Sequence, residues 1–492
     1  FLESLIPMEY AQRAARVMAL YLTDYTEEEL LNFGHNAYGP EKFDDPAAAP
    51  VRKVEDGTYC LELWHGPTSA FKDMALQMLP QLLSAALRKT GEKRTACILV
   101  ATSGDTGKAA MEGFADVPQT RIQVYYPKNG VSAVQEQQMV TQEGENVDVR
   151  AVIGNFDDAQ SGVKRIFSDE AIRAELDRRG FFLSSANSIN WGRILPQVVY
   201  YISAYCDLVR DHAIAMGDKV NFCVPTGNFG DILAAYYAKR MGLPVGKLIC
   251  ASNSNNVLTD FLRTGIYDRN RPFHTTVSPS MDILISSNLE RLLFHFSGEN
   301  DEEVRGYMDA LSKTGRYEVS DAIKAKLADE FWGGFCTEAA TETTIGRYKK
   351  DYGYLIDTHT AVAAEVMGST GLESRELVAS VCQSIRPCCV IAVDALASRS
   401  LGRLCRTVQL ADTGISPGSG VGNHRAALDQ ESLGVPVLAV GVPTVVEGAT
   451  LAADLLGADR LPQSAPGRDI LVTPRDIDRQ VADLSKILGY GI

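Results

Sequence analysis

Short apolar runs alternate with helical patterns between residues 96 and 251, and this alternation limits the fold more than any other feature. The strand-like runs are 96–101, 122–126, 147–153, 220–224 and 248–251. The helical patterns between and after them are 108–115, 156–179, 193–215 and 231–241. Short apolar strands joined through helices are typical of parallel sheets covered on both faces. The sequence therefore predicts an α/β fold, in which ligands bind beyond the carboxyl ends of strands.

The flanking segments are less regular. Residues 8–22 have apolar side chains at helical spacing, and residues 60–63 have the composition of a strand. Pro80 lies inside the helical pattern that follows, which predicts a kink or a break there. Residues 299–330 are rich in charge and predict helices with a solvated face.

Charge excludes some classes of partner. The 492 residues carry a formal net charge of -14, which argues against nucleic acid or an anionic membrane as a general partner. We find no apolar run of membrane-spanning length and no signal peptide. Ten cysteines without a CxxC pair predict reduced thiols, and the seven histidines show no metal-ligand spacing. The sequence thus predicts a cytoplasmic protein with a small-molecule substrate and no metal.

Lys72 is the first candidate for chemistry. A turn over residues 67–69 brings it to the start of an apolar helical run. A lysine among apolar neighbours loses solvation, so its pKa falls and its amine becomes a usable nucleophile. That is the requirement of a Schiff-base lysine. The alternative is a solvated lysine at a helix start.

Two loops follow strands and open helices, which suits anion binding. In the first loop, the hydroxyls and helix-start amides of Thr102, Ser103, Asp105 and Thr106 predict a place for a carboxylate or a phosphate. The alternative for this loop is a plain strand-to-helix turn.

The second loop, 226–231, has two glycines in the same context, which suits a phosphate cradle of main-chain amides. It matches neither the GxGxxG nor the Walker pattern, so a dinucleotide is disfavoured. A third polar cluster, at 187–193, contains Arg193, which either holds an anion by paired hydrogen bonds or forms a surface ion pair. A Schiff-base lysine with two anion loops fits pyridoxal phosphate, with one loop for its phosphate and one for the substrate.

The motifs together resemble threonine synthase of the bacterial and fungal type, a pyridoxal phosphate enzyme of fold type II. The matching stretches are WHGPTSAFKDMA, ATSGDTG, SANSINWGRILPQ, VPTGNFGDILAAYYAKRMGLP and DTHTAVA. The resemblance covers residues 1–365 and implies that Lys72 binds the cofactor covalently. It implies a cofactor-phosphate loop of Gly227, Asn228, Phe229 and Asp231. It implies substrate-carboxylate contacts from Thr102, Ser103, Asp105 and Thr106, with Asn190 and Arg193 as further substrate-side candidates.

The implied reaction converts O-phospho-L-homoserine and water to L-threonine and phosphate, with Lys72 moving protons. This chain departs from the family pattern in two places. That family normally begins with a further N-terminal segment that contains a Ser-Thr-Arg-Gly motif, and this sequence has no match to it. The closing motif, whose hydroxyl faces the pyridine nitrogen, has no counterpart in residues 370–492.

From residue 366 to 492 the chain resembles the C-terminal part of the germination protease of spore-forming bacteria, an α/β protein that degrades small spore proteins. The matching stretches are RPCCVIAVDALASR, DTGISPGSGVGN, GVPVLAVGVPTVV and LVTP. Residues 388–393 predict a buried strand with Asp394 at its carboxyl end, where Asp394 matches one of the family's two acids. Paired carboxylates divide acid and base roles, so one acid argues against peptidase activity, and a capping role for Asp394 explains it equally well.

Three functions remain open on the sequence alone. The first is a threonine synthase-like lyase, with another fold type II lyase such as a dehydratase in the same class. The second is an endopeptidase that acts through Asp394 on a spore protein. The third is a fused chain, joined near residue 366, that binds the cofactor without turnover because the ring-nitrogen partner is missing.

Overall fold

The part of the chain up to Ala364 is built around two β-sheets, each made of parallel strands. The computed structural model describes residues 1–102, 104–370, 378, 382, 387–398, 400–415, 427–456 and 471–474. The chain divides into two units, Phe1–Ala364 and Glu365–Ile492, and each is described by itself. Within the described part of the chain, no helix combines the length and the apolarity that crossing a bilayer requires.

The first sheet has the order β5-β4-β3-β6, with all neighbours parallel. Its strands are β3 (Thr95–Ala101), β4 (Thr120–Pro127), β5 (Val147–Val152) and β6 (Phe181–Ser184). The second sheet has the order β11-β8-β7, also parallel. Its strands are β7 (Val220–Pro225), β8 (Val245–Ser252) and β11 (Phe331–Phe335). The predicted α/β class with parallel sheets is therefore confirmed, although sequence analysis missed β6 and β11.

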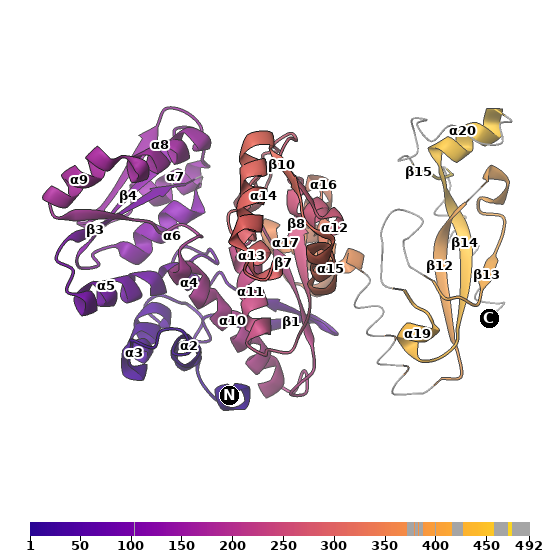
Figure 1. The fold of residues 1–492 in the computed structure, drawn as a ribbon. Coiled ribbons are helices and arrows are strands. Elements are labelled where there is room, and N and C mark those ends of the chain that lie inside the picture. Colours follow the sequence, from indigo (N-terminus) through magenta and orange to yellow (C-terminus); the bar gives the residue numbers. More distant parts are fainter. Residues whose placement is uncertain are drawn as a thin grey trace. The chain divides into compact units, whose positions relative to one another are not determined.

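Helices cover the first sheet on two sides. Figure 1 shows α5 and α6 on one side of β3 and β4, and α8 and α9 on the other. The helices of this region are α5 (Met78–Thr90), α6 (Asp105–Phe114), α7 (Ala133–Val140), α8 (Phe156–Ser168) and α9 (Glu170–Arg178). The long helix predicted over 156–179 is divided at Asp169, whose carboxylate accepts hydrogen bonds from the amides of Ala171 and Ile172. A carboxylate that caps a new helix start ends the preceding helix.

The second sheet is surrounded by the helices that follow residue 190. They are α10 (Trp191–Arg210), α11 (Gly230–Arg240), α12 (Val257–Thr264), α13 (Leu289–Phe296), α14 (Asp301–Thr314), α15 (Asp321–Glu330), α16 (Glu338–Tyr352) and α17 (Thr358–Thr370). The charged segment predicted as helical over 299–330 is interrupted by β10 (Arg316–Glu318), which pairs with β9 (Ile266–Asp268). Helix α10 is buried along residues 193–208, so it forms part of the core.

The N-terminal segment packs around α10 and leads to Lys72. Its elements are α1 (Leu2–Leu5), α2 (Tyr10–Met18), α3 (Glu27–Tyr38), the hairpin of β1 (Val51–Glu55) and β2 (Thr58–Leu61), and α4 (Asp73–Leu76). The break predicted at Pro80 falls at Gln77, between α4 and α5. Pro80 then lies in the first turn of α5, where a missing backbone N–H leaves no bond unmade.

The second unit contains a small mixed sheet. Strands β12 (Val390–Ser398) and β14 (Val437–Glu447) are parallel, and β13 (Gln409–Ala411) and β15 (Leu471–Val472) pair antiparallel with β14. Its helical elements are η2 (Leu401–Arg403), α19 (Gln430–Leu433) and α20 (Gly448–Leu456). Residues 416–426 of the glycine-rich stretch lie outside the described residues.

The prediction that Asp394 ends a buried strand is wrong. Asp394 pairs with Gly441 in the middle of β12, and the strand continues to Ser398. The apolar residues 395–397 extend the strand, and one carboxylate does not stop it. The strand is also not fully buried, because Ile391 is 43% and Val393 is 52% exposed.

Candidate active site

A folded turn fixes the position of Lys72 at the start of α4. The Asp73 carboxylate accepts hydrogen bonds from the backbone amide of Thr68 at 2.8 Å and from its hydroxyl at 2.7 Å. These bonds close the chain back on itself over residues 68–73. Lys72, at the N-cap of α4, is consequently buried, with 9% of its surface exposed.

The Lys72 amine faces a hydroxyl and a carboxylate. Lys72 Nζ donates a hydrogen bond to Ser280 Oγ at 2.9 Å, and it lies 3.5 Å from Asp105 Oδ2. Ser280 Oγ in turn donates to the same Asp105 oxygen at 2.8 Å. The three side chains come from segments far apart in sequence, so only the fold brings them together.

Burial lowers the pKa of Lys72, and the nearby charge of Arg193 lowers it further, while Asp105 and Asp231 act in the opposite direction. Burial alone would raise the pKa of Asp105, but the charge of Lys72 and hydrogen bonds from Ser280 and Gln135 bring it to about 2. Desolvation of both partners thus opposes their mutual attraction.

The loop after β3 is organised by the hydroxyl of Thr102. Thr102 Oγ1 accepts from the amides of Gly104 and Gly107, each at 3.0 Å, and donates to the Gly104 carbonyl. Gly104 has φ +144°, and a Cβ there would lie 2.4 Å from the Gln135 side chain, so glycine is required. Because Thr102 is engaged within the loop, the first-turn amides of α6, at Asp105 and Thr106, are the donors open to a ligand. Ser103 lies outside the described residues.

Asp105 does not suit direct contact with a substrate carboxylate. Its own carboxyl group is ionised above a pKa of about 2, and two like charges at contact repel. Its side chain instead accepts from Ser280 and from Gln135, the latter at 2.8 Å. We therefore assign any substrate contact at this position to the backbone.

The loop after β7 presents two backbone amides on one side. The Gly227 carbonyl accepts from Ser286 Oγ at 2.9 Å, and the Asn228 carbonyl accepts from both the backbone and the side chain of Asn288. In a trans peptide the N–H points opposite to the C=O, and the chain has no cis peptide among the described residues. The N–H groups of Asn228 and Phe229 therefore point away from the 286–288 segment, which makes an anion cradle.

The same loop is tight and strained. A Cβ on Gly227 would lie 2.7 Å from the Ser280 carbonyl oxygen, so no side chain fits there. Phe229 has φ +64°, and its ring is fully buried against Phe331. Such backbone conformations of bulky residues concentrate at functional sites. Burial raises the pKa of Asp231, in the first turn of α11, to about 6.

The third polar cluster, at residues 187–193, has a partly structural role. Asn190 caps α10 by accepting from the Gly192 amide, and it donates to the Ser185 carbonyl. Arg193 is 3% exposed and donates to the Ala186 carbonyl at 2.7 Å, while its Nε has no hydrogen-bond partner. Burial lowers the pKa of this guanidinium to about 10. A buried donor without a partner is costly, so Arg193 is suited to an anionic ligand.

The residue that joins the two loops is Ser280, which sequence analysis missed. It lies in η1 (Pro279–Met281), where its hydroxyl contacts Lys72 and its carbonyl lies against Gly227. Its amide donates to His359 Nε2, and His359 Nδ1 lies 3.2 Å from Asp357. The one sequence signal near this contact is the DTHT stretch, which contains Asp357 and His359 and matches the threonine synthase pattern without indicating a role for Ser280. The Val-Ser-Pro-Ser-Met turn has no catalytic signature.

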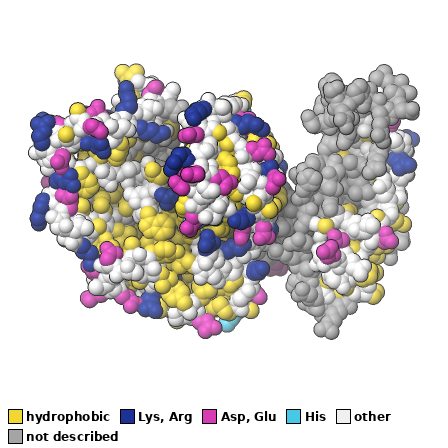
Figure 2. All heavy atoms as spheres, in the orientation of Figure 1, with side chains coloured by type: hydrophobic (Ala, Val, Ile, Leu, Met, Phe, Trp, Pro, Cys, Tyr) yellow, Lys and Arg dark blue, Asp and Glu magenta, His cyan; other side chains and the backbone are white. Residues whose placement is uncertain are grey.

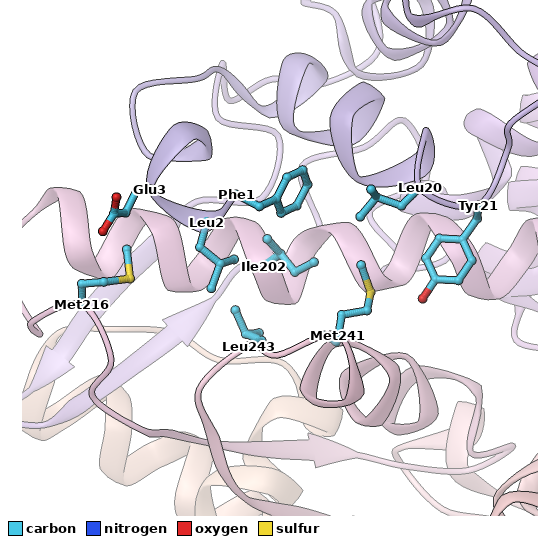
Figure 3. A pocket seen from close by; sticks show the side chains of 10 residues that line it. Phe1, Leu2, Glu3, Leu20, Tyr21, Ile202, Met216, Met241 and Leu243 are labelled. Carbon is cyan, nitrogen blue, oxygen red and sulfur yellow. The ribbon is translucent and has the colours of Figure 1, made fainter.

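A separate apolar groove lies beside α10. Figure 3 shows Leu2, Leu20, Tyr21, Ile202, Met241 and Leu243 lining it, and Figure 2 shows hydrophobic side chains gathered on the face that it draws. Its lining is apolar apart from Glu3, and it does not include Lys72 or either loop. It is therefore separate from the site around Lys72.

Comparison with known proteins agrees with this geometry. A family model described as "Pyridoxal-phosphate dependent enzyme" matches residues 47–319. Threonine synthase of Pseudomonas aeruginosa is 41% identical over 360 residues, which cover 73% of this chain and 74% of that protein. The chain belongs to the threonine synthase family. Its cofactor is pyridoxal phosphate, and its fold is that of fold type II.

Other relatives give the extent of the match. "Threonine synthase-like 1" of Homo sapiens is 42% identical over 373 residues, covering 74% of this chain and 50% of that protein. The match with this chain thus spans about half the length of "Threonine synthase-like 1". The structure of threonine synthase from Brucella melitensis, with pyridoxal phosphate bound, has a TM-score of 0.69, 40% identity, and coverage of 75% of this chain and 76% of that chain. Yeast threonine synthase gives a TM-score of 0.68 at 34% identity, covering 74% of both chains.

The C-terminal part matches a second family. The model described as "Germination protease" covers residues 351–458, so the chain joins a threonine synthase-like part to a germination protease-like part. This match begins at residue 351, inside residues 1–365, whose motifs resemble threonine synthase. The structure divides the chain at 364/365.

The described residues fit the cofactor. Pyridoxal phosphate needs an amine for its aldehyde and a cradle for its phosphate. Lys72 provides a desolvated amine, and the Asn228 and Phe229 amides form a cradle with no space for a side chain at Gly227. The described residues contain no group of three side chains that could hold a metal ion.

Proposed function

We propose that the chain is a threonine synthase-type lyase that converts O-phospho-L-homoserine and water to L-threonine and phosphate. The observation that carries the proposal is the contact of Ser280 with both Lys72 and Gly227. It supports a single site, in which Lys72 and the loop after β7 serve the same cofactor molecule.

In this mechanism, the Lys72 amine would hold pyridoxal phosphate, and Lys72 Nζ would accept and return the proton of the substrate. The amides of Asn228 and Phe229 would hold the cofactor phosphate, and Gly227 would allow its close approach. The amides of Asp105 and Thr106, at the N-terminus of α6, hold the substrate carboxylate. Bound pyridoxal phosphate supplies the electron sink that makes carbon–hydrogen bonds of the substrate acidic.

The buried guanidinium of Arg193 supports an anionic substrate. It has an unpaired donor, and a substrate with both a carboxylate and a phosphate supplies charge to match it. Asn190 is secondary, because both ends of its amide are already bonded to backbone.

The test is phosphate release after reconstitution with pyridoxal phosphate. We expect release from O-phosphohomoserine, and a borohydride-trapped adduct at Lys72. L-serine and L-threonine serve as comparison substrates, because faster ammonia release from them would indicate a dehydratase. Neither phosphate release nor an adduct would end the proposal, whereas an adduct without turnover would favour a chain that binds the cofactor but is catalytically incomplete.

For the germination protease-like part we propose no independent peptidase. The chemistry needs two carboxylates, and the family match carries one, Asp394, in the middle of β12. Cleavage of a small spore protein by the wild type that is abolished by Asp394→Asn would contradict this.

A further inference from the structure

Lys72, Ser280 and Asp105 form a chain of three polar groups that the proposed function does not use in full. We propose that Ser280 and Asp105 are a proton relay that takes the ammonium proton from Lys72 when this amine captures the cofactor. The inference rests on the proposed function only in taking Lys72 as the cofactor lysine. It makes Ser280 a catalytic residue, since its hydroxyl touches the reacting nitrogen.

The hydrogen bonds run in one direction. Lys72 Nζ donates to Ser280 Oγ at 2.9 Å, and Ser280 Oγ donates to Asp105 Oδ2 at 2.8 Å. The direct distance from Lys72 Nζ to Asp105 Oδ2 is longer, at 3.5 Å. A hydroxyl that accepts from a cation and donates to an anion is oriented for proton transfer.

The transfer balances in protons and charge. One proton leaves Lys72 Nζ for Ser280 Oγ as the hydroxyl proton of Ser280 passes to Asp105 Oδ2. Ammonium and carboxylate become amine and carboxylic acid, and Ser280 ends as it began, a hydroxyl. The net charge of the three groups is zero before and after, and no other reactant is needed.

Burial favours this neutral pair. Desolvation lowers the pKa of Lys72 and acts to raise that of Asp105, and the low pKa of Asp105 depends on the charge of Lys72. When Lys72 gives up its proton, that charge disappears and Asp105 becomes a better acceptor. Arg193 opposes the charge on Lys72 and Asp231 favours it. The other titratable side chain beside Asp105 is His359, whose Nε2 accepts from the Ser280 amide.

The surroundings hold the relay in place. Gln135 donates to the other oxygen of Asp105 at 2.8 Å, which leaves Oδ2 for Ser280. The Ser280 amide is bonded to His359. Both ends of the relay are therefore positioned by groups outside it.

The experiment times covalent capture of pyridoxal phosphate by the apoprotein. At saturating cofactor, the rise in absorbance of the lysine adduct reports the covalent step alone. Positioned proton transfer contributes about 10²–10⁴-fold, so we expect Ser280→Ala to slow this limiting rate by at least about tenfold. Ser280→Thr keeps a hydroxyl and should restore most of the rate.

The matched control is Ser203→Ala. Ser203 is buried, its hydroxyl accepts from Arg13 at 2.8 Å, and Asp207 lies beside the same guanidinium. This is also a cation, a hydroxyl and a carboxylate, but away from Lys72. We expect Ser203→Ala to leave the capture rate unchanged, whatever it does to stability.

A second measurement is the solvent isotope effect on the limiting rate. The limiting rate of the wild type should fall in D2O, and in a folded Ser280→Ala protein this isotope effect should be lost. A wild-type rate without a solvent isotope effect, or an unchanged limiting rate in Ser280→Ala, would overturn the relay. No homoserine phosphate is present, so failure of the lyase proposal would leave this result unaffected.

Discussion

The backbone amide of Ser280 donates a hydrogen bond to Nε2 of His359 across 3.3 Å. For Nε2 to accept, the ring proton must lie on Nδ1, which faces Asp357 at 3.2 Å. The Asp357–His359 pair at the start of α17 therefore sets the position of the turn that contacts Lys72.

His359→Ala should displace this turn. An amide left without its acceptor costs about 1 kcal/mol or more, so we expect the free energy of unfolding to fall by about that amount and cofactor capture to slow. Denaturant unfolding and the capture rate measure the two effects. His35→Ala, on the exposed side of α3, is the control. A wild-type capture rate in His359→Ala would show that the turn is held by other contacts.

Asp105→Asn should shift the titration of Lys72. The Asp105 charge raises the pKa of Lys72 against burial, so its removal lowers that pKa. Removal of an opposite charge at this range changes a pKa by about one unit or more. The pH midpoint of reductive methylation of Lys72 in the apoprotein, followed by mass spectrometry, should move down by about one pH unit. Asp309→Asn, exposed on α14, should leave the midpoint in place, and an upward shift in Asp105→Asn would contradict the assignment.

Gly227→Ala should weaken cofactor binding. The added Cβ would lie 2.7 Å from the Ser280 carbonyl oxygen and 3.1 Å from Met281 Cα, and both are backbone atoms. Overpacking of this kind costs about 1–3 kcal/mol, so the dissociation constant should rise at least about fivefold in a spectroscopic titration. Gly346→Ala, where nothing lies within 4 Å, is the control. Equal affinity in the two variants would argue against a phosphate cradle at 227–229.

Ser286→Ala should have a smaller effect at the same loop. It removes the hydrogen bond that holds the Gly227 carbonyl, and a single bond contributes about 1 kcal/mol. We expect roughly a fivefold loss of cofactor affinity with the fold retained. Ser84→Ala, in which a buried hydroxyl on α5 is removed away from the loops, controls for loss of a serine. Tighter binding in Ser286→Ala would show that the bond holds the loop in an unproductive form.

The α/β class and most strands followed from local signals. The apolar runs at β3, β4, β7 and β8 are too short for helices and alternate with helical patterns, so their length and context favour strands. The break at Asp169 depended on one side chain capping a helix, and β10 depended on pairing with β9, more than 45 residues earlier. The cap at Asp169 reaches only residues 171 and 172, so it was a local signal that sequence analysis missed, whereas the β9–β10 pairing is not visible in a short window of the sequence.

The site was predictable where chemistry has a local pattern. Lys72 and the loop at 227–231 could be proposed because a lysine at the start of an apolar helical run, and two glycines between a strand and a helix, have distinct sequence environments. Ser280 could not, because its hydroxyl matters through partners 208 and 175 residues away. Thr102 was predicted as a ligand contact, but its hydroxyl instead closes its own loop.

The left-handed backbone of Phe229 has a consequence for how this protein meets its cofactor. The ring of Phe229, locked among core aromatics, keeps the peptide units of the cradle in their binding orientation before any phosphate arrives. The entropy of ordering that loop is thus spent during folding and does not weaken the later association. A smaller side chain at 229 would leave a cavity beside Phe331 and loosen these peptide units, so both the fold and the association with pyridoxal phosphate would weaken.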